Sequence, residues 1–308
     1  MAITFRQIRY FIAATKAGKL SLAAANLNVT QSTVSTAINN LEDDLGAPLF
    51  YRKAGGITLT YEGHQFLRHA QNIMFAVSEA SRGLKRSGDT LKGEVTIGVT
   101  YTVAGYFLPD LLMRFNRTFP QVKVNLIEKQ RTEIEQGIID NQYELGVLLV
   151  SNLENTDLLS SRTLTRSRRR LWLNTNHPLR NSRIISLKDL SVEPYVMLTV
   201  DEANQTAMKY WEKTPYRPNV VFKTSSVEAV RSLVAIGMGI TILSDMVYRP
   251  WSIEGQFVEV KEVSGHIPSM DTGLVWKKDK KLSQSAITFV DYLCQAFADR
   301  RNITDSLS

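Results

Sequence analysis

The chain has 308 residues, enough for about two domains with substantial cores. Its 44% hydrophobic and 22% charged residues are ordinary for a globular protein, and its 17 Gly and 9 Pro residues exclude a fibrous or low-complexity chain. The single cysteine, Cys294, excludes an internal disulfide and any CxxC site, and the four histidines lack the paired spacing of metal ligands. We therefore expect neither a metal nor a cofactor.

The sequence also predicts where the protein works. No apolar run reaches the ~18 residues that span a bilayer. Arg6 and Arg9 interrupt the apolar N-terminal stretch, which therefore does not resemble a signal peptide. Since a single cysteine also fits a reducing compartment, we expect a cytoplasmic protein that does not contact membranes.

The net charge of +7 is unevenly distributed. Residues 1–93 contain 11 basic and 6 acidic residues, whereas residues 94–308 contain 26 and 24, so most of the excess lies in the first third. A small basic domain joined to a nearly neutral large one suggests a module that binds a polyanion. An ordinary solvated basic face would give the same numbers, so charge alone leaves both interpretations open.

Residues 5–49 are expected to form three short helices. Apolar residues at helical spacing predict the first, which ends at Gly18, and residues 20–27 form the second. Asn28 predicts a tight corner because Asn tolerates the left-handed conformation, and Thr30 is a good N-cap for the third helix. That helix has one apolar stripe, and its other faces carry uncharged hydroxyls and amides, including Gln31, Ser32, Thr33, Ser35, Thr36, Asn39 and Asn40.

This is a helix-turn-helix pattern. A purely solvated face would more often carry Lys and Glu, whereas short uncharged donors and acceptors suit base edges and phosphate oxygens. The pattern therefore favours DNA binding, with an ordinary three-helix bundle as the alternative.

Residues 49–60 then predict a wing, a small hairpin whose basic turn places Arg52 and Lys53 where they could reach phosphates. A long helix is expected from Thr60 to about Arg86, with apolar residues in heptad alternation. Such a seam favours pairing with a second chain, although packing within one chain is the alternative. A linker with a glycine near each end, residues 87–93, follows.

The remaining residues alternate strands and helices. Strands expected at residues 94–99, 122–126 and 145–150, with helices between them, imply a largely parallel sheet. A second unit of the same kind follows up to about residue 243, and a strand at 274–276 and a helix at 283–298 close the chain. Ligands in such two-lobed folds lie at the carboxyl ends of strands.

Several segments resemble the LysR-type transcriptional regulators. The N-terminal resemblance is ordered and dense over residues 5–11, the Ala-rich 22–27, VTQSTVS at 29–35, LE at 41–42, LFYR at 49–52 and LTYEG at 59–63. The later GMGI at 237–240 matches the family's glycine-bearing turn into a strand. The resemblance covers nearly the whole chain but is weaker in residues 150–300.

The resemblance implies an α/β multi-domain protein. Residues 1–59 would form a winged helix-turn-helix, residues 60–93 a dimerising linker helix and hinge, and residues 94–308 an effector-binding domain like the periplasmic binding proteins. Its two α/β lobes would be residues 94–164 with 266–308, and residues 165–265. It further implies a homodimer through the linker helix, assembly into homotetramers, dyad-symmetric double-stranded DNA as a partner, and a small-molecule effector between the lobes.

The resemblance also implies individual contacts. The major groove would be read by Gln31, Ser32, Thr33, Ser35 and Thr36, while the wing, with Arg52 and Lys53, would meet phosphate. Many family members carry a basic residue at the positions of Thr36, Asn39 or Asn40, which are neutral here. We therefore expect no arginine–guanine contact from these positions and a shallower salt dependence.

Candidate effector residues follow two expected strands and two later turns. Thr100 and Thr102 lie where a strand turns toward a helix, a place where hydroxyls and free backbone N–H groups suit an anion. By alignment with the family, Arg131 lies closest to the cleft, where a guanidinium could clamp a carboxylate. The other lobe offers Thr199, Asn204 and Ser225. The cluster of Arg166, Arg168, Arg169 and Arg170 is interpreted as a solvated lobe edge rather than a second DNA contact.

Two other classes of protein compete with a bacterial transcription regulator. An enzyme is disfavoured because no GxSxG, P-loop, HExxH or strand-linked GxGxxG motif appears. A free-standing solute-binding protein would have the α/β portion. It would, however, carry a signal peptide and would have no DNA-binding head.

Overall fold

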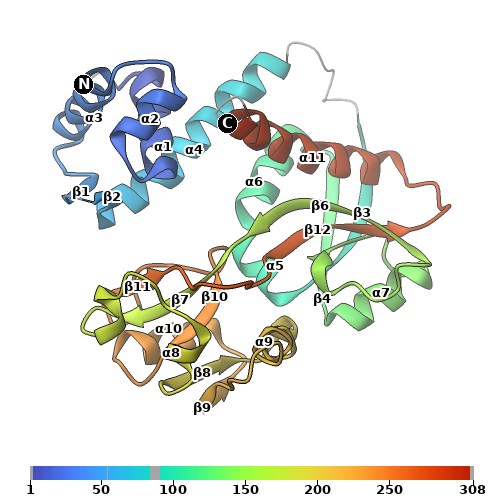
Figure 1. The fold of residues 1–308 in the computed structure, drawn as a ribbon. Helices are drawn as coiled ribbons and strands as arrows, with labels where there is room; N and C mark the ends of the chain where they lie inside the picture. Colours follow the sequence, from blue (N-terminus) through green and yellow to red (C-terminus); the bar gives the residue numbers. More distant parts are fainter. Residues whose placement is uncertain (1–2, 54, 84–90, 306–308) are drawn as a thin grey trace. The chain divides into compact units, whose positions relative to one another are not determined.

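The structure is a computed structural model that describes residues 3–53, 55–83 and 91–305 (Figure 1). It divides into two compact units, Met1–Thr90 with Ala298–Ser308, and Leu91–Phe297, and each is described by itself. We call residues 3–83 the head and residues 91–297 the effector unit. Within the described ranges, no helix is both long enough and apolar enough to cross a membrane.

Local sequence signals set the limits of the first three helices. α1 (Phe5–Ala17) begins with a capping box formed by Thr4 and Gln7 and ends at Gly18, whose φ of 66° is left-handed. α2 (Leu20–Asn26) is followed by Asn28 with a φ of 53°, and the hydroxyl of Thr30 caps α3 (Gln31–Leu45). The predicted helix-turn-helix is confirmed.

The three helices share a core. Val34, Ile38 and Leu41 from α3 are fully buried with Phe11 of α1 and Ala23 of α2. These are the residues of the apolar stripe, so the polar faces of α3 remain outside. Each helix buries the apolar side chains of one face. The removal of these side chains from water stabilises the packing of the three short helices.

The predicted wing is present and is attached to α3. β1 (Phe50–Lys53) pairs antiparallel with β2 (Gly56–Leu59). The carboxylate of Glu42 on α3 accepts hydrogen bonds from the backbone N–H groups of Leu49 (2.7 Å) and Phe50 (3.0 Å). Because Glu42 accepts hydrogen bonds from two backbone N–H groups of the wing, it ties the wing to α3.

The long helix α4 (Tyr61–Gly83) packs part of its expected apolar seam against the head of its own chain. Ala70 is fully buried in the head core, with Phe66 and Met74 packed beside it. Ile73, on the same seam, is 38% exposed. Packing within one chain, the alternative interpretation, therefore accounts for the first part of the seam. The side chain of Ala80 and all of Leu84 lie outside the described residues.

The first lobe of the effector unit is built on a five-stranded sheet in the order β4-β3-β5-β12-β6. β3 (Gly93–Val99) pairs parallel with β4 (Val122–Glu128) and β5 (Leu145–Leu149), as predicted. β12 (Met270–Lys277) runs antiparallel between β5 and β6 (Leu159–Ser167). Four helices belong to this lobe: α5 (Tyr101–Tyr106), α6 (Pro109–Thr118), α7 (Arg131–Ile139) and α11 (Gln284–Asp305).

The second lobe has a mixed topology. β8 (Pro194–Leu198) and β9 (Asn219–Thr224) are parallel, but β7 (Arg169–Asn174) lies antiparallel between β10 (Thr241–Ser244) and β11 (Val258–Lys261). Its helices are α8 (Leu187–Leu190), α9 (Ala203–Trp211) and α10 (Val227–Ala235). The expectation of a second parallel unit was wrong for β7 and β10, because strand positions alone do not specify which strands become neighbours.

The chain passes between the lobes at the ends of two paired strands. β6 pairs with β12 up to the partners Ser167 and Met270, and β7 begins at Arg169 in the second sheet. β6 was not anticipated from the sequence. Only Leu159 and Leu164 of this strand are buried, so it lacks the apolar run that identified β5.

We predict that Glu42→Ala weakens the attachment of the wing by about 2 kcal/mol, since the N–H groups of Leu49 and Phe50 lose a charged acceptor. Hydrogen exchange of a peptide covering these two amides should accelerate about thirtyfold. Asp43→Ala removes an exposed carboxylate from the same helix and serves as the control. Equal acceleration in both variants would show that Glu42 does not hold the wing.

Candidate functional site

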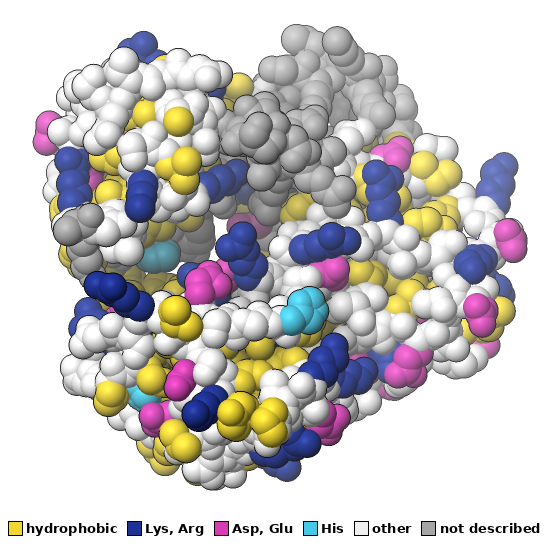
Figure 2. All heavy atoms as spheres, viewed as in Figure 1, with side chains coloured by type: hydrophobic (Ala, Val, Ile, Leu, Met, Phe, Trp, Pro, Cys, Tyr) yellow, Lys and Arg dark blue, Asp and Glu magenta, His cyan; other side chains and the backbone are white. Residues whose placement is uncertain are grey.

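Over residues 31–40, the outer face of α3 is polar and uncharged. Gln31, Ser32, Thr33 and Thr36 are exposed and Ser35 is half-buried. The hydroxyl of Thr30 lies 2.8 Å from that of Ser32 and 2.7 Å from that of Thr33, so the first turn presents a connected group of hydroxyls. Figure 2 shows mainly uncharged surface over the visible face of the head, with Lys and Arg around it.

Arg52 of the wing lies against this face. Its guanidinium donates to the side-chain oxygen of Asn39 and forms an ion pair with Glu42 at 3.3 Å, while its side chain is 45% exposed. It is thus positioned at the edge of α3 by two of that helix's own residues. The side chain of Lys53 lies outside the described residues.

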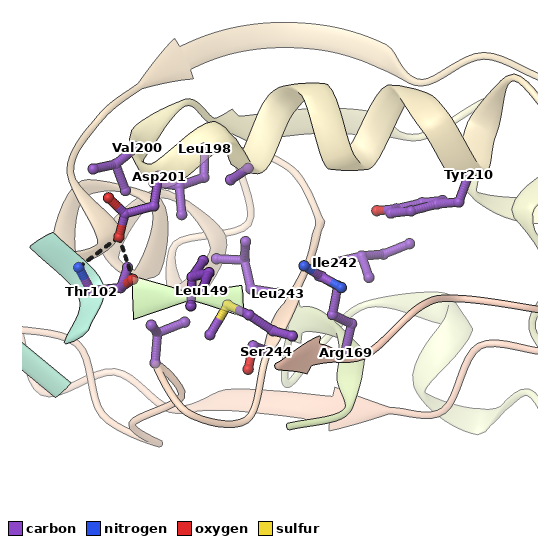
Figure 3. Close-up of a pocket in the computed structure, with 13 residues that line it drawn as sticks. Thr102, Leu149, Arg169, Leu198, Val200, Asp201, Tyr210, Ile242, Leu243 and Ser244 are labelled. Atoms are coloured by element: carbon purple, nitrogen blue, oxygen red, sulfur yellow. Dashed lines mark hydrogen bonds between the residues drawn. The ribbon is translucent and has the colours of Figure 1, made fainter. Parts of the chain in front are cut away.

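A cavity of about 30 Å³ lies between the lobes of the effector unit. Figure 3 shows its lining, which is mostly apolar, with polar side chains converging from both lobes. The polar members are Thr102, Arg169, Asp201, Tyr210 and Ser244, and the apolar members are Leu149, Leu198, Val200, Ala203, Ile242, Leu243, Val247 and Met270. Such a volume holds water but not an organic molecule.

Thr102 faces a carboxylate of the other lobe. Asp201 belongs to the 3₁₀ turn η4 (Val200–Glu202), and its Oδ2 accepts hydrogen bonds from the Thr102 backbone N–H at 2.7 Å and from the Thr102 hydroxyl. Both bonds are drawn in Figure 3. Thr102 was expected in a turn before a helix near Pro109, but it lies within the additional helix α5, where Thr100 is the N-cap residue.

Arg131 is buried and pairs with carboxylates of its own chain. Its guanidinium bonds Glu135 at 2.6 Å, Glu202 at 2.7 Å and Glu154 at 2.9 Å. Burial alone would lower the pKa of Arg131, but the hydrogen bonds with Glu135 and Glu202 outweigh it and raise the pKa above its ordinary value.

The clamp expected of Arg131 therefore disagrees with this structure. Each of its three nitrogens already meets a carboxylate, and Arg131 does not line the cavity. Arg131 is the first residue of α7, which Gln130 caps. We interpret Arg131 as a buried ion-pair centre that joins the first lobe to Glu202 of the second.

Arg169 is the cation that does line the cavity. It donates from Nη1 to the backbone carbonyls of Pro268 and Ser269, the latter at 2.6 Å. Burial lowers its pKa. No carboxylate within the described ranges lies at ion-pair distance from it, whereas Arg166 and Arg170 pair with Asp271 and Asp245. The interpretation of the whole arginine cluster as a solvated edge was wrong for Arg169.

Tyr210 points toward the same region as Arg169 in Figure 3, and burial raises its pKa well above its ordinary value. Its hydroxyl therefore stays protonated and uncharged near neutral pH.

The other candidate effector residues do not line the cavity. Thr100 is buried and its hydroxyl has no hydrogen-bond partner among the described residues. Thr199 precedes η4 and donates its backbone N–H to the Thr224 carbonyl, Asn204 is half-buried in α9, and Ser225 is exposed. They lie near the expected strand ends, but their side chains do not reach the enclosed space.

A second bridge between the lobes starts from the same short helix as Thr102. The hydroxyl of Tyr106 on α5 donates to Glu228 on α10 at 2.8 Å, and Arg231 forms an ion pair with the same carboxylate. Burial and Glu228 together raise the pKa of Tyr106 to about 12. Polar side chains thus join the two lobes at a second place.

Nothing in the described part of the chain forms a metal centre: His, Cys, Asp and Glu side chains do not gather there in groups of three or more.

Comparison with known proteins agrees with this architecture. Residues 5–64 match the helix-turn-helix of bacterial regulatory proteins of the lysR family, and residues 88–298 match the LysR substrate binding domain. The chain is 30% identical to the transcriptional regulator YwqM of Bacillus subtilis, over 95% of this chain and 99% of that protein. It is 29% identical to the transcriptional activator CmpR of Synechocystis sp., over 94% of each.

A solved structure shows the same arrangement. HinK, a LysR family transcriptional regulator from Pseudomonas aeruginosa, superposes with a TM-score of 0.62 at 27% identity, covering 96% of this chain and 98% of that one. A helix-turn-helix head and a substrate-binding domain in one chain are the parts of a regulator and not of an enzyme. The protein belongs to the LysR family of transcriptional regulators.

Proposed function

We propose that this regulator binds dyad-symmetric operator DNA as a homodimer and that a small organic anion, bound between the lobes, modulates its activity. The observation that carries the DNA-binding part is the exposed, uncharged face of α3, with Gln31, Ser32, Thr33, Ser35 and Thr36 as the readers. Their amide and hydroxyl groups can both donate to and accept from base edges. Phosphate contacts would come from cations around this face, among them Arg52 and Lys53 of the wing.

The assembly is also part of the proposal. Ile73 leaves apolar surface on α4 on a face turned away from the head core, although its neighbour Met74 packs against that core. A second copy of α4 would cover it, joining two heads on the two half-sites of a palindrome. Pairing of such dimers into a homotetramer, and a cytoplasmic location without membrane contact, complete the proposal.

The effector part is supported by Arg169. A cation without a carboxylate partner, held at a cavity between two lobes, is costly unless an anion approaches it. Thr102, Tyr210 and Ser244 supply further hydrogen-bonding groups, and the apolar lining suits a carbon skeleton. We therefore place Arg169 and Thr102 at the centre of the effector site, and we place Arg131, Thr100, Thr199, Asn204 and Ser225 outside it.

The cavity volume of about 30 Å³ has a mechanistic consequence. An organic anion can enter only if the lobes or the side chains that line the cavity move, and we expect this movement to couple binding to the arrangement of the lobes. A ligand shifts this equilibrium by its difference in affinity for the two arrangements. Effector binding would thereby change the relation between lobes and, through the assembly, the spacing of the DNA-binding heads.

We predict that Gln31→Ala weakens binding to the operator by about 1–3 kcal/mol, the value of one good base contact, and weakens binding to random DNA much less. Fluorescence anisotropy with the DNA upstream of the gene and with a random duplex of equal length measures both affinities. Gln65→Ala, an exposed glutamine of α4, is the control. Equal losses on both duplexes would assign Gln31 to positioning rather than reading.

We predict that Arg169→Gln reduces the affinity for small organic carboxylates at least about tenfold, since a charge-assisted hydrogen bond is lost, and leaves operator binding of the unliganded protein nearly unchanged. A thermal-shift screen of organic acids followed by calorimetry measures the effect. Arg168→Gln removes an equal charge from the exposed neighbouring position and is the matched control. Identical behaviour of the two variants would remove Arg169 from the effector site.

A further inference from the structure

We propose that Asp201 is a built-in carboxylate that occupies the place of the effector's carboxylate on Thr102, so that the effector opens the lobes by displacing it. The inference rests on the proposed effector function of the interlobe cavity and adds the group that an incoming anion must replace. Three observations carry it: the contacts of Asp201, the conformation of its backbone, and the closed cavity beside it.

The contacts of Asp201 are those of a bound anion. One oxygen, Oδ2, accepts from both the backbone N–H and the hydroxyl of Thr102, and Thr102 is 3% exposed. Asp201 comes from the second lobe and Thr102 from the first, 99 residues away in the chain. A free carboxylate placed at the cavity would seek the same two donors, because they are the first lobe's polar groups on its lining.

The turn that carries Asp201 is strained. Asp201 has a φ of 49° and Glu202 a φ of 61°, a left-handed conformation that is unfavourable for residues with a Cβ, and two such residues are consecutive. Both side chains leave this turn toward the first lobe, where Glu202 bonds Arg131 at 2.7 Å and Asn152 at 3.0 Å. The Asn152 amide also reaches the Asp201 carbonyl at 3.3 Å. The cross-lobe contacts hold a backbone conformation that is unfavourable without them.

The cavity explains why displacement is required. Asp201 and Thr102 both line it, and the enclosed space of about 30 Å³ is smaller than any organic carboxylate needs. If the Asp201 side chain withdrew, the cavity would gain the volume of a –CH₂–COO⁻ group beside the two donors of Thr102. Arg169 lines the same cavity. An organic carboxylate would then restore the lost hydrogen bonds on the first lobe, but without a covalent link to the second.

The test uses acetate, which has the chemistry of the missing side chain, and the full-length protein. Asp201→Gly removes the carboxylate and relieves the left-handed strain, because glycine adopts positive φ readily. We expect this variant to bind acetate saturably and about tenfold or more tightly than the wild type, the factor that a charge-assisted hydrogen bond supplies. The NMR shift of the Thr102 amide proton reports occupancy at that site.

Two control variants separate occupancy from charge and from backbone effects. Asp201→Asn removes the negative charge but keeps a side chain on Thr102, so it should bind acetate little better than the wild type. Asp279→Gly makes the same substitution at another exposed left-handed aspartate, with a φ of 58°, and should gain no acetate binding. Equal gains in the Asn and Gly variants at position 201 would mean that only charge repulsion was relieved, and the inference would be overturned.

A second measurement does not depend on the glycine variant. A neutral amide is a weaker acceptor than a carboxylate, so the Thr102 amide should exchange its hydrogen faster in Asp201→Asn than in the wild type. Unchanged exchange would show that Asp201 does not hold Thr102, and would also overturn the inference. Neither measurement needs operator DNA or the natural effector. If the Asp201 tests fail, the proposed function therefore still stands. If the Gln31 and Arg169 predictions fail, acetate can still bind beside Thr102, so the two failures are distinguishable.

Discussion

The closed arrangement of the effector unit depends on two adjacent carboxylates. Asp201 and Glu202 extend from one strained turn and together bond Thr102, Arg131 and Asn152 of the first lobe. Such bonds are stronger where water is kept away from them.

The buried ion pairs around Arg131 hold its guanidinium in place on the first lobe. Glu135 is fully buried, and hydrogen bonds from Arg131 and Asn155 outweigh the effect of burial and lower its pKa. Glu135 therefore remains ionised and keeps Arg131 in place whether or not Glu202 stays bound. The movable partners are then those on the second lobe. Arg131 does not line the cavity, whereas Arg169 does.

In the head, the uncharged polar groups and the cations lie on different elements. Its reading face is uncharged, and its cations lie on neighbouring elements, where Arg52 is aligned by Asn39 and Glu42 of α3 itself. Amides and hydroxyls have little affinity for DNA by themselves, so surrounding cations would supply attraction while α3 supplies selectivity. The charge excess of residues 1–93 is thus compatible with an α3 that carries no Lys or Arg.

Local chemistry made the head predictable from its residues. Gly18, Asn28 and Thr30 act within a turn of their own position, and the apolar stripe of α3 follows from helical periodicity. The effector site was not accessible in this way. Arg131 and Arg169 are both arginines at the ends of strands, and only the packing of two lobes shows that three carboxylates surround the first while the second faces the cavity. Asp201 reaches Thr102 across 99 residues of chain. Periodicity and caps are short-range properties that a sequence displays directly, whereas the pairing of charges between lobes depends on which distant residues the fold brings together.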